Sequence, residues 1–146
     1  RYIQEDLGSV SLFDIIESGK KNGTPWDGDL VEILNQVMTD LPKIKFETAD
    51  GYDFGLSVRE KKFCAKSIRW DLNYFKYCFL KLTRIPFDEM ELENEFEQLE
   101  TLLLEIAVSS GKKTFLYRDF QSRNVMIKDG KPFYIDFQGG FEGPIY

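Results

Sequence analysis

The chain of 146 residues contains no histidine and only two cysteines. Without histidine, Ser-His-Asp catalysis, Cys-His catalysis and every imidazole-based metal site are excluded. Cys64 and Cys78 lie in apolar surroundings and lack the spacing of metal ligands. We therefore expect buried free thiols in a reduced compartment. Carboxylates and amides must carry any chemistry.

Basic stripes and long apolar runs are also missing. The net charge is −6 and no run of Lys and Arg forms a stripe, which disfavours a nucleic-acid partner, although a phosphate pocket can still be locally positive. No signal peptide opens the chain and no apolar stretch approaches the length of a membrane span. The sequence predicts a cytoplasmic protein without a membrane partner.

Aromatic and other apolar residues are plentiful, at 15% and 42% of the chain. This length and composition fit one domain, or one large lobe of a bigger protein, with a core rich in large rings. Trp26 and Trp70 are expected in that core, with Trp26 kept open as a ligand contact because its loop is flanked by Gly and Pro.

Apolar spacing predicts a mostly helical first part of the chain. The expected helices cover residues 9–18, capped by Ser9 and ended by Gly19; 29–41, stopped by Pro42; 61–82, before Pro86; and 88–109, with Asp88 and Glu91 as a capping box and Gly111 as the stop. Residues 43–58 are expected to be loop with one short strand. The acidic residues of 88–100 are expected on the solvated face of their helix.

Short strands are predicted only after Gly111, at residues 114–117, 125–128 and 132–135. The last two enclose the polar turn 128–132 and form a hairpin. Helices followed by a small hairpin indicate the α+β class.

Three polar residues surround this hairpin. Asp119 and Asn124 are five positions apart, and Asp136 follows twelve positions after Asn124. Each carboxylate alone would be read as an ordinary turn residue. The hairpin brings these three residues to one point. There Asp119 is suited to accept the proton of a hydroxyl group, and the oxygens of Asn124 and Asp136 are suited to bind magnesium. This pattern favours phosphoryl transfer.

The segments YRDFQSRNVMI (117–127) and YIDFQGG (134–140) resemble the catalytic loop and magnesium-binding segment of the aminoglycoside phosphotransferase and choline kinase superfamily. Their wording is closest to bacterial kinases that phosphorylate N-acetylmuramate or N-acetylglucosamine at the anomeric hydroxyl. The resemblance implies the mainly helical large lobe of a protein-kinase-like fold. Its small β-hairpin would carry the catalytic loop and the metal-binding aspartate.

The same resemblance implies ATP and Mg²⁺ as cofactors and a hydroxyl of a sugar, amino sugar or amino alcohol as acceptor. It assigns Asp119 as catalytic base; Asn124 and Asp136 as metal ligands; Met126 and Ile135 as the floor under adenine; and Glu5, Asp6 and Leu7 as its edge, within a hinge at residues 1–8. Arg118 and Arg123 would contact phosphate or support the loop, the second role being favoured.

The chain departs from the family pattern at two places. Tyr117 stands where many kinases have histidine, and Gly139-Gly140 follow where the sugar kinases often place an acidic residue, so the sugar preference is not transferred. The glycine-rich loop and strand lysine of kinases precede the hinge, where this chain begins.

We therefore expect residues 9–146 to be a partial large lobe with negligible kinase activity alone. Apolar surface left exposed near the hinge and hairpin would favour self-association. The alternative is a pseudokinase-like binding or regulatory module without turnover; the intact Asp119, Asn124 and Asp136 favour the enzyme.

Overall fold

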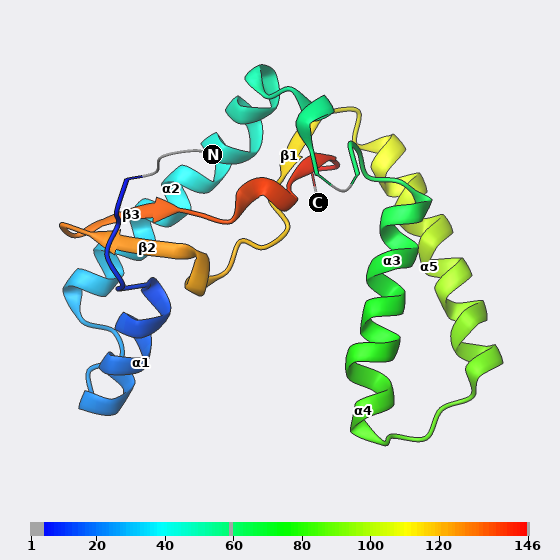
Figure 1. The fold of residues 1–146 in the computed structure, drawn as a ribbon, viewed down its shortest axis with the longest axis horizontal. Helices are drawn as coiled ribbons and strands as arrows, with labels where there is room; N and C mark the ends of the chain where they lie inside the picture. The colour runs from blue at the N-terminus through cyan, green and yellow to red at the C-terminus, as the bar shows by residue number, and fades with distance from the viewer. Residues whose placement is uncertain (1–4, 59, 146) are drawn as a thin grey trace. The chain divides into compact units, whose positions relative to one another are not determined.

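The computed structural model describes residues 5–58 and 60–145 (Figure 1). Its main helices are α1 (Leu12–Asn22), α2 (Gly28–Gly51), α3 (Ala65–Phe75), α4 (Lys81–Thr83) and α5 (Glu89–Ser109), and its strands are β1 (Thr114–Leu116), β2 (Val125–Lys128), β3 (Lys131–Tyr134) and β4 (Phe141–Gly143). This mainly helical structure with short antiparallel strands confirms the α+β class. None of the described helices combines the length and apolar character needed to cross a membrane.

The described residues divide into two compact units. Unit 1 contains residues 5–52 and 115–140, and unit 2 contains 53–58, 60–114 and 141–145. The chain therefore leaves unit 1 after Tyr52 and returns to it at Phe115. These two residues meet edge to face, with ring centroids 5.2 Å apart.

Helix α1 begins and ends later than expected. Ser11, rather than Ser9, is the N-cap, and its side chain exchanges hydrogen bonds with Asp14 in a capping box. The start is delayed because Val10 and Ser11 are paired with β2: the Ile127 N–H donates to the Val10 carbonyl at 2.9 Å. Gly19 lies buried within the helix, which ends at Gly23 with a left-handed backbone (φ 75°).

Helix α2 continues through Pro42, so the prediction that proline would stop it is wrong. It is capped by Asp27, whose side chain accepts from the Leu30 N–H at 2.8 Å. Pro42 lies on the exposed side, where water can satisfy the carbonyl that loses its helical donor. The expected loop after Pro42 is therefore helical to Gly51, followed by a 3₁₀ turn at Phe54–Leu56 and no strand in the described part of 43–58.

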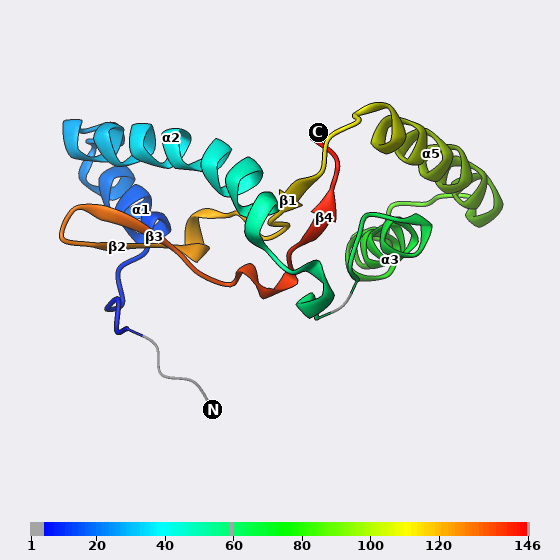
Figure 2. The ribbon, with the colours of Figure 1, turned by 90° about the horizontal axis from the view of Figure 1, so that it is seen from above.

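The hairpin of unit 1 closes as predicted. Strand β2 has the expected bounds, whereas β3 lies one residue earlier, pairing Val125 with Tyr134 and Lys128 with Lys131. Asp129 and Gly130 both have positive φ, as a two-residue type I′ turn requires. Figure 2 shows the hairpin beside α1 and α2. The apolar core of unit 1 fills the space between them: Leu12, Leu30, Ile33, Val37 and Val125.

Unit 2 contains a helical hairpin. Helix α3, a π-helical turn (Lys76–Leu80) and α4 run without a break, and α5 lies alongside in the opposite direction (Figure 1). The expected start at residue 61 is wrong because residues 61–63 instead pair with Glu142. The predicted N-cap Asp88 is confirmed: it accepts from the Glu91 N–H at 2.9 Å.

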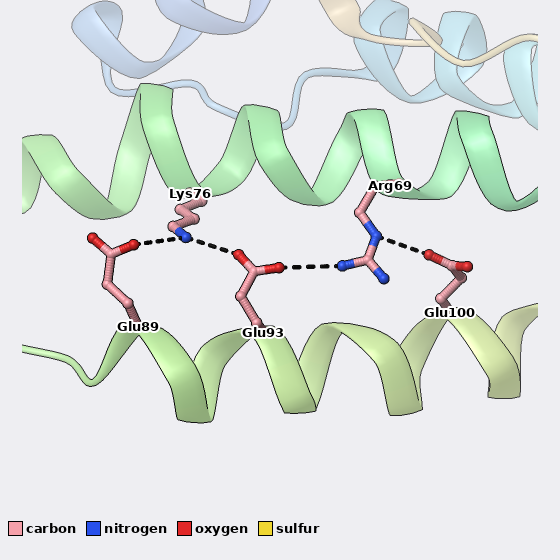
Figure 3. A network of polar contacts seen from close by, with 5 residues as sticks. All are labelled: Arg69, Lys76, Glu89, Glu93 and Glu100. Carbon is pink, nitrogen blue, oxygen red and sulfur yellow. Dashed lines mark hydrogen bonds and ion pairs between the residues drawn. The ribbon is translucent and has the colours of Figure 1, made fainter.

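An ionic network joins the two helices of unit 2 (Figure 3). Lys76 Nζ lies 2.9 Å from Glu89 and 2.8 Å from Glu93. Arg69 reaches Glu93 at 3.3 Å and Glu100 at 2.9 Å. The expectation that the acidic residues of α5 all face solvent is therefore wrong. The signal was present as a seven-residue spacing, 69 to 76 on one helix and 93 to 100 on the other.

Several residues expected in the core are exposed. Trp26 is 70% exposed and Trp70 is 49% exposed. Cys64 and Cys78 are free thiols, but Cys64 is half-buried and Cys78 is exposed. Cys78 lies in the π-helical turn.

Candidate active site

The predicted catalytic loop leaves β1 with an uncommon backbone conformation. Arg118 has φ 71° and Asp136, after β3, has φ 67°. Side chains at such positions cost about 1–3 kcal/mol each and persist where the surroundings hold them, often at functional sites. Both lie at the site indicated by the sequence.

Asn124 connects the two ends of the hairpin. Its Nδ2 donates to the Asp119 carbonyl at 2.9 Å and to Asp136 Oδ2 at 3.4 Å. Its own carbonyl accepts from the Ile135 N–H at 3.0 Å. The structure thus brings Asp119, Asn124 and Asp136 together. Because Nδ2 makes both contacts, the Oδ1 oxygen of Asn124 is the atom available to a cation.

Tyr117 lies close enough to Asp119 and Asp136 to feel the charge of both carboxylates. Its ring is buried, and its hydroxyl donates to the Ile135 carbonyl at 2.6 Å. Burial first, and then the charges of Asp136 and Asp119, together raise the pKa of Tyr117 to about 12. Tyr117 therefore ties the predicted catalytic loop to the residue before Asp136.

Gln138 and the two glycines that follow complete the surroundings. Gln138 Nε2 donates to Asp136 Oδ1, so each oxygen of this carboxylate receives an amide donor. A Cβ on Gly139 would lie 3.5 Å from Asp119 Oδ2, and one on Gly140 would lie 2.3 Å from the Phe115 ring. Sequence reasoning missed Gln138 as a site residue, although its position two residues after Asp136 was a usable signal.

The donor set is suited to a hard cation. The Asn124 amide oxygen and the Asp136 carboxylate offer the oxygen ligands that Mg²⁺ prefers. Asp119 and Asp136 are exposed and Asn124 is half-buried, so the site is open to solvent and substrate.

Some of the residues predicted to contact adenine lie in β2 or in the segments that contact it. Lys128 Nζ pairs with Glu5 Oε1 at 2.7 Å and donates to the Asp6 carbonyl at 3.0 Å. Glu5 and Asp6 are exposed, and three others, Leu7, Met126 and Ile135, are half-buried. Residues 1–4 of the predicted hinge lie outside the described residues.

The two arginines of the motif differ in what the structure assigns them. The Arg123 guanidinium lies 3.6 Å from the centre of the Phe13 ring on α1. Arg118 is half-buried beside the catalytic loop. The Arg123 contact agrees with a supporting role.

Comparisons with models of known protein families, with curated proteins and with solved structures give no match for this chain. Its function must be argued from the site itself.

Proposed function

We propose that the chain carries the catalytic and metal-binding part of an ATP- and Mg²⁺-dependent kinase that phosphorylates a hydroxyl group of a small molecule. The observation that supports the proposal is the hydrogen-bonded set of Asp119, Asn124 and Asp136, held at the two ends of one hairpin. A hydroxyl of a sugar, amino sugar or amino alcohol is the acceptor class, as the sequence resemblance implies.

Each residue has a distinct task in this reaction. Asp119 accepts the proton of the acceptor hydroxyl, whose oxygen forms a bond to the γ-phosphorus while the bond to the β,γ-bridging oxygen breaks and ADP leaves. Asn124 and Asp136 hold Mg²⁺, which when bound neutralises charge on the phosphates. Gln138 and Tyr117 keep Asp136 and the segment before it in place.

Metal-dependent nucleotide binding tests the assignment directly. We expect the 146-residue chain to bind Mn²⁺–ATP, measured by calorimetry and by the paramagnetic broadening of nearby NMR signals. D136N should lose the metal dependence while keeping its left-handed backbone, which asparagine tolerates. D129N is the matched control, since Asp129 has the same backbone region but lies in the hairpin turn. Equal binding by D136N and D129N would contradict the proposal.

Asp119-dependent phosphate transfer would mark the chain as an enzyme, as opposed to a binding module. D119N should retain Mn²⁺–ATP binding, because Asp119 is assigned as base and not as ligand. We expect the chain alone to transfer phosphate to sugars or amino alcohols negligibly, since it contains no glycine-rich loop or strand lysine of the kinase type. Asp119-dependent transfer by this chain would support the kinase and overturn that expectation.

A further inference from the structure

We propose that Arg123 is a positioning residue for Asn124, acting through the ring of Phe13. This inference rests on the proposed function and adds a residue to it. The Arg123 guanidinium carbon lies 3.6 Å from the centre of the Phe13 ring. Arg123 and Asn124 belong to one short 3₁₀ turn, Ser122–Asn124. Holding the Arg123 side chain against Phe13 therefore restricts the backbone, and with it the orientation of the Asn124 side chain.

The start of α1, against which Arg123 packs, is itself held by hydrogen bonds. Phe13 lies in the first turn of α1, next to the capping box in which the Ser11 N–H and hydroxyl both donate to Asp14 Oδ2, at 2.9 and 2.6 Å. These hydrogen bonds lower the pKa of Asp14, and the positive charge of Arg123 adds to the effect. The Arg123 cation therefore lies over the Phe13 ring and close enough to the Asp14 carboxylate to interact with its charge, and both the ring and the carboxylate favour it.

A second attachment lies on the other side of Asn124. The Ile127 N–H donates to the Val10 carbonyl at 2.9 Å, and Ser11 pairs with Met126. The segment of residues 10–13 thus holds the chain at 123 and again at 126–127. Asn124 lies between the two attachments, which restricts the orientations open to its amide.

Arg123 acts through Asn124 and not on the phosphates. Its guanidinium lies over the Phe13 ring of α1, whereas the Asn124 amide donates hydrogen bonds to Asp119 and Asp136. An exposed cation–π contact is worth roughly 0.5–1 kcal/mol, so its loss should weaken metal-nucleotide affinity about two- to five-fold and should not abolish it.

Two readouts on the same variants test the proposal. The side-chain amide signals of Asn124 are followed by ¹⁵N NMR without metal, and Mn²⁺–ATP affinity is measured by calorimetry, for R123A, F13L and the double variant. K20A, which removes an exposed cation from the same helix, is the control. R123K keeps a cation beside the ring and should restore most of the effect, and thermal unfolding checks that each variant is folded.

We expect R123A and F13L to shift the Asn124 amide signals and to weaken affinity to the same extent, with no further loss in the double variant. K20A should change neither. The inference is overturned if F13L leaves the amide signals unchanged while R123A shifts them, or if affinity stays constant while only the melting temperature falls. If the unsubstituted chain binds no Mn²⁺–ATP, the proposed function fails, and the amide signals still decide whether Arg123 positions Asn124.

Discussion

The two units differ in how far charged side chains help to hold their helices together. In unit 1, α1, α2 and β2 meet through apolar side chains, such as Leu12, Leu30 and Val125, that are at most 4% exposed. In unit 2, Ile68 of α3 and Phe96 of α5 are buried as well, but charged side chains also link α3 to α5, and the Lys76 side chain is only 4% exposed. Many other apolar residues of α3, the π-helical turn, α4 and α5 are exposed: Trp70, Tyr74, Phe75, Tyr77, Phe79, Leu82, Met90, Leu99, Leu102 and Val108.

The difference indicates which of the two units should keep its structure when the salt concentration changes. Apolar contacts in a dry core respond little to salt, whereas ion pairs with partly exposed partners are screened by it. The candidate site lies on the unit with the apolar core, so its geometry should survive conditions that loosen the helical pair of unit 2.

The largest expected effect comes from truncating the unit 1 core. Leu30 is 1% exposed, and L30A should lower the free energy of unfolding by about 2–5 kcal/mol, because the transfer energy of the side chain is lost and a cavity remains. Chemical denaturation gives the loss, and amide hydrogen exchange locates it. L82A, at a side chain 73% exposed on α4, is the control; equal losses would contradict the comparison.

A smaller loss is expected at the glycine pair after Asp136. The ring of Phe115 leaves no room for a Cβ on Gly140, whereas Gly139 has ordinary contact distance to Asp119. G140A should cost about 1–3 kcal/mol through overpacking, and G139A should cost less, because its Cβ would make only ordinary contacts. Thermal unfolding of the two variants checks this order, and a reversed order would refute the packing account.

Removing one hydroxyl should affect unit 1 less again. Y117F deletes the donor to the Ile135 carbonyl and should cost about 1–2 kcal/mol, because a buried acceptor is left without its partner. We also expect weaker Mn²⁺ binding, since Ile135 precedes Asp136. Urea denaturation and calorimetry measure the two effects. An unchanged affinity would show that the tyrosine supports the fold alone.

The smallest effects, and the ones confined to unit 2, should come from its ionic network. Hydrogen bonds from Lys81 and then Lys76 lower the pKa of Glu89 to about 2, from an ordinary 4.5. Its stabilising contribution is therefore complete above about pH 4.5 and is lost as the pH falls toward 2. Glu93 first, and then Glu89, raise the pKa of Lys76, whose contribution is lost only as the pH rises above the ordinary value of lysine.

Hydrogen exchange of the α3 and α5 amides should rise at pH 3 and also in 1 M NaCl at pH 7. Asp14 of unit 1 also has a lowered pKa, through hydrogen bonds to Ser11, so a low pH can affect both units. The experiment in 1 M NaCl is therefore the one that distinguishes unit 2 from unit 1. E93Q, which weakens contacts to both Arg69 and Lys76, should remove most of the salt response. Equal salt responses in α2 and α5 would end the distinction between the units.

The sequence predicted those features whose causes are local. The Asp129-Gly130 turn, the strand after Asn124 and the Asp88 cap depend on neighbouring residues, and all three are present. The course of α2 through Pro42 could not be predicted, because it depends on which side of the helix faces solvent. The ionic network required knowing that two helices run antiparallel. Of the candidate site, the three polar residues were predicted, whereas the hydrogen-bond partners of Tyr117 and Gln138 depend on the fold and are seen only in the structure.

The contact between Tyr52 and Phe115, which closes a long intervening segment, has a consequence for folding during synthesis. During synthesis, α1 and α2 leave the ribosome long before β2, so Leu30 and its neighbours remain without the strand that covers them until the intervening residues have been made. The thermodynamic cost of such a long closure grows only slowly with its length, but the delay lengthens the time for which apolar surface is open to chaperones and to aggregation. A change within residues 53–114 could therefore alter the yield of correctly folded protein without touching the candidate site.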